Sequence, residues 1–349
     1  MRNSLARIFR FPVIGPIISL LVVSSAVGLT TDRFFMLDNL NNVALQASIV
    51  AIVGIGSTLV ILTGGIDLSP GSAIALLTMI MAQLIRTNGV PVPVAIVLVL
   101  VLSAIMGAFN GLLSSYGRIP SFITTLAAMN IFRGIAFLFN DGSPIFSVSP
   151  ELEPWFYGKL FGIALPFFYV LIFYGLAYVF LQYTPAGRRI YAIGGNEPAA
   201  RLSGINVHQT RFMAFVIAGL MAGIGSILMT ARLNSGSPNY GVGTEMQAIG
   251  AAVVGGASLA GGYAHIVATM VGALIIVVVQ NGLNLNAVPT SWQNITLGAI
   301  IALAVFIDMW RADFGRLLGR VWGRITSRSP TAGSAAARGA SPSHSDEPE

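Results

Sequence analysis

Long apolar runs without Asp, Glu, Lys or Arg dominate the chain between residues 11 and 310. A helix that crosses a bilayer needs about 20 mostly apolar residues. Backbone amides in lipid must be satisfied within their own segment, so these runs predict helices rather than strands. We expect about ten transmembrane helices, at residues 12–30, 42–63, 69–86, 92–115, 119–139, 161–183, 211–231, 246–260, 264–284 and 290–309. The predicted fold class is therefore an all-α polytopic integral membrane protein.

The composition excludes several classes of function. Hydrophobic residues make up 55% of the 349 residues and charged residues 9%, against about 25% charged in a soluble domain. The chain has no cysteine and three scattered histidines, so we predict no metal site and no thiol nucleophile. Its one lysine, Lys159, follows Gly158 but precedes Leu160, which is not a phosphate-binding loop. We predict no cofactor, no enzymatic activity and no ATP hydrolysis by that route.

The arginines predict the orientation. With ten spans and a cytoplasmic N-terminus, only Arg33, Arg86, Lys159 and Arg232 fall outside, Arg133 falls within a span, and the remaining basic residues lie inside. Cytoplasmic loops carry the excess of Lys and Arg, so we expect both termini in the cytoplasm. The net charge of +6 is explained by this topology and does not indicate a nucleic-acid partner.

The same pattern divides the chain. We expect a cytoplasmic N-terminus (1–11), a transmembrane domain (12–310) with a long inside loop (184–210), a basic juxtamembrane segment near anionic lipid (311–326) and a disordered cytoplasmic tail (327–349). Residues 141–159 form a predicted outside loop.

Polar residues within or beside the spans are the candidates for a solute path. They are Asp67, Asn110, Asn130, Asn281 and Asn284. Each has a structural alternative, an interhelical hydrogen bond. No acid is clearly placed at mid-membrane, which disfavours an ion-coupled carrier. A path without fixed charge suits a neutral hydroxyl-rich solute such as a sugar.

Glycines mark predicted close contacts and breaks. Gly107–Gly111 and Gly219–Gly223 are GxxxG patterns, which let helices approach closely. The pairs Gly64-Gly65 and Gly255-Gly256 interrupt apolar runs and predict broken helices. The segments Gly64–Ser69 and Gly255–Ala260 resemble each other, as do Asn110–Leu112 and Asn281–Leu283, so we expect a weak internal repeat.

Four segments resemble a known family. They are Thr184–Val207, Thr63–Gly71, Gly255–Gly262 and Asn281–Asn284. Together they closely resemble the membrane permease subunits of ribose-type ABC sugar importers, within the superfamily that includes branched-chain amino acid permeases. The resemblance covers about residues 40–310.

The resemblance implies a mechanism for the 184–210 loop. It would form a short cytoplasmic coupling helix that sits in a groove of a separate ATP-binding cassette ATPase subunit. The predicted coupling residues are Asn196, Glu197, Ala199, Ala200, Arg201 and Gly204. Ala199, Ala200 and Gly204 match the family pattern, but Pro198 occupies the usual place of the acid and Glu197 precedes it. Pro198 suits the first position of such a helix, with Asn196 as its cap and Glu197 at its positive end.

The resemblance also implies a periplasmic sugar-binding protein, a second permease copy and a bacterial inner-membrane location. The solute would be a monosaccharide, with ribose-like pentoses first. Nucleosides, polyols and branched-chain amino acids remain alternatives, as does an ion-coupled secondary transporter that uses Asp67. We expect Arg133 to face water or a helix carbonyl end rather than the solute.

Overall fold

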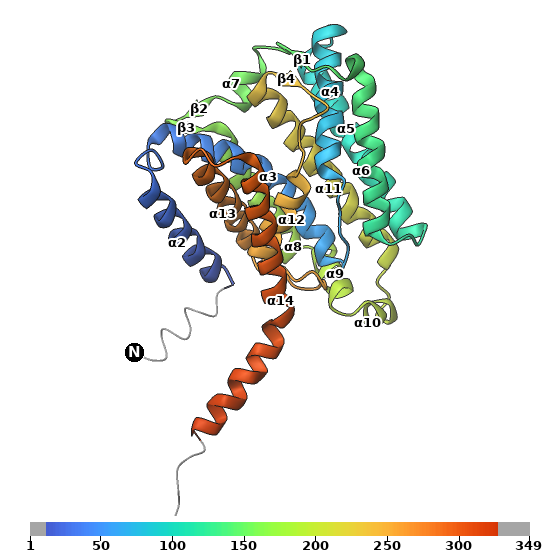
Figure 1. Cartoon of the computed structure of the whole chain (residues 1–349). Coiled ribbons are helices and arrows are strands. Elements are labelled where there is room, and N and C mark those ends of the chain that lie inside the picture. Colours follow the sequence, from blue (N-terminus) through green and yellow to red (C-terminus); the bar gives the residue numbers. More distant parts are fainter. Residues whose placement is uncertain (1–11, 327–349) are drawn as a thin grey trace, which may run out of the picture. The chain divides into compact units, whose positions relative to one another are not determined.

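The structure is a computed structural model that describes residues 12–326, most of them in helices (Figure 1). The longer helices are α2 (Ile14–Thr30), α3 (Leu37–Leu62), α4 (Pro70–Ala82), α5 (Val92–Gly111), α6 (Ser121–Leu138), α8 (Leu165–Tyr183), α9 (Pro185–Gly195), α11 (Val207–Leu233), α12 (Thr244–Val254), α13 (Ile266–Leu285) and α14 (Thr290–Thr326). The short ones are α7 (Leu152–Phe156), α10 (Glu197–Leu202), the π-helical turns η1 (Gln83–Thr87) and η2 (Leu112–Tyr116) and the 3-10 turn η3 (Phe139–Gly142). The chain divides into two units, residues 1–308 and 309–349.

Four two-residue strands lie in the connections. β1 (Ile145–Phe146) pairs antiparallel with β4 (Ser235–Gly236), and β2 (Lys159–Leu160) pairs antiparallel with β3 (Ile163–Ala164). The predicted outside loop 141–159 therefore contains β1, which pairs with the distant β4, and the β2–β3 hairpin follows at its end. It delays the start of α8 to Leu165, where the sequence predicts residue 161.

Eight helices of the described part are long and apolar enough to cross a membrane, by length and composition. They coincide with eight of the ten predicted spans. The other two predicted spans, 12–30 and 246–260, are the 17-residue α2 and the 11-residue α12. α12 ends early because Gly255 and Gly256 follow it, and Gly256 has a φ of +91° that favours glycine. The orientation of the termini remains a prediction, and the predicted end segments 1–11 and 327–349 lie outside the described residues.

α3 forms the centre of the bundle. It lies among α8, α11, α12 and α13 (Figure 1), and nearly all of its residues from Ala47 to Leu62 are buried. The continuous run of apolar and small residues in this segment explains why a helix can be enclosed on every side.

α5 and α11 cross at the two predicted GxxxG patterns. A Cβ atom on Gly219 of α11 would collide with the carbonyl oxygen of Ser103 and lie 2.8 Å from the Cα of Gly107, both on α5. One on Gly107 would collide with the carbonyl oxygen of Phe215. The backbones touch because neither helix carries a side chain at the crossing, as the sequence predicts.

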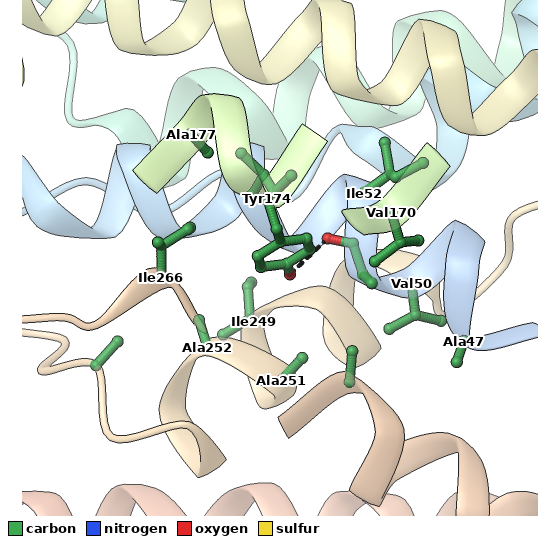
Figure 2. Packing of buried hydrophobic residues seen from close by; sticks show 14 of the residues in the cluster. Ala47, Val50, Ile52, Val170, Tyr174, Ala177, Ile249, Ala251, Ala252 and Ile266 are labelled. Carbon is green, nitrogen blue, oxygen red and sulfur yellow. Dashed lines mark hydrogen bonds between the residues drawn. The ribbon is translucent and has the colours of Figure 1, made fainter. Parts of the chain in front are cut away.

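Tyr174 joins α8 to α3. Its ring lies in an apolar cluster with Ile52 of α3, Ile249 of α12 and Ile266 of α13 (Figure 2). Its hydroxyl donates a 2.9 Å hydrogen bond to the carbonyl of Ala51. Buried tyrosine hydroxyls need such a partner, and the bond contributes about 1 kcal/mol.

Candidate coupling loop and solute path

Side-chain caps order the loop between α8 and α11. The hydroxyl of Thr184 accepts the amide of Gly187 at the start of α9, 3.1 Å away. Asn196 accepts the amide of Ala199 at 2.9 Å and begins α10, and Asn206 accepts the amide of Gln209 at 3.0 Å and begins α11. Each cap satisfies an amide that has no partner within its helix, and is worth about 1 kcal/mol. Side-chain caps thus fix the starts of the two loop helices, α9 and α10, and of α11.

The end of α10 explains the spacing between Ala200 and Gly204. Ile205 donates its amide to the carbonyl of Ala200 and Gly204 donates to Arg201, both at 3.1 Å. This is a Schellman motif, which needs a left-handed residue, and Gly204 supplies it with a φ of +79°. Ala200 is buried in a small cluster with Ile193 and Val207, whereas Ala199 is exposed. Pro198 is the second residue of α10, one place later than the sequence predicts.

Glu197 ties α10 to the bundle. Its carboxylate lies 3.0 Å from Arg201 within α10 and 3.0 Å from Arg211 on α11. Burial raises the pKa of Glu197, but the hydrogen bonds and charges of Arg211 and Arg201 outweigh it and leave the pKa below its usual value. Arg211 also donates to the carbonyl of Thr63, 3.3 Å away, at the end of α3. A chain of contacts thus leads from α10 to the break between α3 and α4.

A glycine junction, consisting of Gly64, Gly194, Gly261 and Gly262, joins the loop to both broken helices. A Cβ atom on Gly194, at the end of α9, would collide with the carbonyl oxygen of Leu62 and the amide nitrogen of Gly262. Gly262 donates its amide to that same carbonyl at 3.0 Å. A Cβ atom on Gly261 would lie 3.0 Å from the nitrogen of Gly64. If α9 moved, its end at Gly194 would therefore press against the backbone at the end of α3 and in the α12–α13 connection.

A cavity of about 510 Å³ lies beside α10. The α3–α4 connection, the turn before α6, α10 and the first turns of α11 enclose it. Its charged lining residues are Arg118, Arg201, Arg211 and Glu197. The excess of arginine makes it complementary to carboxylate groups, which guanidinium binds well.

The candidate path residues form hydrogen bonds with other residues of the protein. Asp67 accepts the amide (2.9 Å) and the hydroxyl (2.7 Å) of Ser69, and Asn110 donates to that hydroxyl at 2.8 Å. Asp67 and Asn110 thus form one buried group around Ser69. This arrangement fits the structural alternative that the sequence leaves open.

The remaining candidates are spread over the bundle. Asn281 of α13 and Asn39 of α3 exchange amide hydrogen bonds of 2.9 and 3.0 Å. Asn284 accepts from Gln293, and Asn130 donates to the carbonyl of Leu126 within its own helix. The structure therefore does not bring the five candidates into one site.

Arg133 forms hydrogen bonds with the backbone of the loop between β4 and α12. Its guanidinium donates to the carbonyls of Pro238 at 2.5 Å and Tyr240 at 2.9 Å, in the segment between β4 and α12. These acceptors lie in a loop, whereas the sequence predicted water or a helix carbonyl end as the partner of Arg133.

Two features were missed from the sequence. Leu202, at the end of α10, is 91% exposed, although a leucine in an alanine-rich helix is usually taken for a core residue. A second cavity, of about 200 Å³, is lined by Gln46, Gln247 and Gln280. The sequence could have indicated this cavity, because its three glutamines lie on separate apolar helices. Among the described residues, no three His, Asp or Glu side chains gather to hold a metal ion.

These features define a multi-pass helical membrane protein with an ordered loop at one end. The chain belongs to the permease family described as branched-chain amino acid transport system, permease component, whose model matches residues 39–305. The resemblance to ribose-type permeases is also confirmed. The chain is 42% identical to the ribose import permease protein RbsC of Escherichia coli K12, over 84% of this chain and 92% of that protein.

Other relatives match over similar lengths. RbsC of Bacillus subtilis 168 is 39% identical over 84% of this chain and 92% of its own length. The D-allose transport system permease protein AlsC of Escherichia coli K12 is 33% identical over 82% of this chain and 88% of its own. No solved structure matches the chain significantly.

Proposed function

We propose that the chain is the membrane-spanning permease subunit of a binding-protein-dependent ABC importer. It would carry a monosaccharide into the cytoplasm across the bacterial inner membrane, without catalysing a reaction itself. The names of the relatives, which refer to ribose and D-allose, support a sugar as the solute, and we take ribose-like pentoses as the first candidates.

The observation that carries the proposal is the construction of α10. Three capped helices, two ion pairs and a glycine turn hold it rigid, yet its last residue, Leu202, lies 91% exposed. An exposed large apolar side chain on an ordered polar loop is suited to a pocket of a partner. We infer that the ATPase subunit grips α10 through its accessible residues, Asn196, Glu197, Ala199, Arg201 and Leu202, while buried Ala200 and the turn at Gly204 hold the helix in shape.

The arginines of the neighbouring cavity extend this surface. Arg118 and Arg201 carry charge that acidic side chains of the ATPase would complement. A displacement of α10 would pass through Arg211 to Thr63 and through Gly194 to Leu62 and Gly262. We infer that closure of the ATPase drives the two helix breaks by this route.

On the opposite side, the loop of residues 141–159 is the proposed docking surface for the periplasmic binding protein. A second permease copy would complete the pore. Exposed apolar residues of α5, α6 and α14, such as Val101, Ile131 and Leu303, are available to that copy or to lipid.

Transport by purified protein in vesicles tests the proposal. We expect uptake of labelled ribose only when ATP, the ATPase subunit and the binding protein are all present. Accumulation by the chain alone on an imposed proton or sodium gradient would instead favour the ion-coupled alternative. Asp67→Asn separates the two, because it abolishes gradient-driven uptake only if Asp67 is the coupling group.

A further inference from the structure

The glutamine cavity lies between four helices. Its lining includes Gln46 of α3, Arg232 of α11, Gln247 of α12 and Gln280 of α13. Its volume of about 200 Å³ far exceeds the about 10–15 Å³ that one water needs. It is therefore large enough for a molecule bigger than water.

The amide groups are only partly paired. Gln247 donates to the side-chain oxygen of Gln280 at 3.3 Å, and Gln46 donates to the side-chain oxygen of Asn42 at 3.2 Å. A primary amide has two donors and an acceptor with two lone pairs. The oxygens of Gln46 and Gln247 and the NH₂ group of Gln280 therefore retain bonding capacity for a guest.

The charge and the apolar surface of the cavity lining further restrict which molecule can bind there. Arg232 is the one charged residue lining the cavity, and no carboxylate lines it to balance an ammonium group. Ile49, Val50 and Val277 supply apolar walls. Amides for hydroxyls and aliphatic walls for C–H faces suit a neutral polyhydroxylated molecule better than a zwitterionic amino acid.

We propose that this cavity is a transient binding site for the permeating solute, a neutral polyhydroxylated molecule of monosaccharide size, held by Gln46, Gln247 and Gln280. The inference rests on the proposed function. Under the predicted orientation, the beginning of α3 and the end of α13 face outward, so the solute would meet the site as it enters from the binding protein.

The first test compares uptake with ATP hydrolysis. The complete transporter is reconstituted with wild-type chain, with the Gln247→Leu/Gln280→Leu double variant, or with Gln83→Leu, a glutamine outside the cavity. We expect the double variant to lose about tenfold or more of labelled ribose uptake per ATP, with binding-protein-stimulated ATPase activity within twofold of wild type. The Gln83→Leu control keeps both. Unchanged uptake per ATP in the double variant overturns the proposal.

The second test needs no transport. Because the chain has no cysteine, Gln280→Cys introduces a single thiol. We expect a membrane-impermeant thiol reagent to label it in membranes, and excess ribose or allose to slow the labelling at least twofold. Phe146→Cys, at a residue 65% exposed outside the cavity, is labelled without protection by sugar. Failure to label Gln280→Cys, or labelling that neither sugar slows, overturns the cavity proposal. If the wild-type transporter imports no sugar, the proposed function fails, and this labelling still decides the cavity.

Discussion

Glu197 links two helices through its contacts in the loop of residues 184–210. It sits where the family pattern shifts by one residue, and Pro198 follows it. The displaced acid still reaches two arginines, because the first turn of α10 directs it toward both Arg201 and Arg211. Its charge also lies at the positive end of α10, where an anion is favourable.

The pKa of Glu197 predicts a pH dependence. The pKa is lower in the folded protein than its usual 4.5, so the stabilisation is present above that value and is lost as the pH falls through the lowered pKa. At neutral pH we expect Glu197→Gln to speed amide hydrogen exchange in α10 by on the order of two- to fivefold, as for a partly exposed ion pair. With rates corrected for intrinsic exchange, this difference should vanish in acid below the lowered pKa.

Glu151→Gln, which removes an exposed acid outside the loop, is the matched control and should leave exchange in α10 unchanged. Equal exchange rates for wild type and Glu197→Gln at neutral pH would show that the ion pairs do not order the helix.

At the scale of elements, the sequence predicts what depends on local pattern. Apolar runs predict ten spanning helices, of which eight are long and apolar enough to span in the described residues, and glycine pairs predict the breaks after α3 and α12. The predicted length of α12 was wrong. The charge-free run Met246–Ile307 covers 62 residues, and its charge pattern does not indicate where the helices within it end. The residues that follow α12 instead form left-handed turns at Gly256, Gly261 and Gly262.

The candidate path residues illustrate the limit of sequence for sites. Asn281 pairs with Asn39, which is 242 positions away in the sequence. Whether an asparagine lines a path or joins two helices depends on what lies opposite, and no local pattern specifies that. The asparagine cap of α10 was predictable, because a cap is a contact between neighbours in sequence.

The α5–α11 crossing gives a prediction about packing. In Gly219→Val the new side chain meets backbone of Ser103 and Gly107, and we expect it to destabilise the fold by about 1–3 kcal/mol through overpacking. The midpoint of thermal unfolding in detergent measures this. Gly175→Val on α8, where an added Cβ meets nothing within 4 Å, is the control and should keep the wild-type midpoint. Equal midpoints for both variants would mean that the helices separate at little cost.

At the scale of the molecule, the two ends of the bundle are built differently. The loop that contains α10 is fixed by caps, ion pairs and the glycine junction, as a part that transmits force needs to be. The glutamine cavity lies among the helices with amide groups only partly paired. We therefore propose a solute conduit that a partner subunit operates at one end.

Co-purification with the ATPase subunit tests that claim most directly, using Leu202→Asp against Phe161→Asp. Both residues are about equally exposed, at 91% and 90%, so neither change should alter the free energy of unfolding by more than about 0.5 kcal/mol. Leu202→Asp places a charge on the surface proposed for the ATPase, whereas Phe161→Asp alters the β2–β3 hairpin. We predict that Leu202→Asp loses the ATPase subunit on purification and at least tenfold of ATP-driven uptake, and that Phe161→Asp retains the subunit. Full assembly and wild-type uptake by Leu202→Asp would contradict the account.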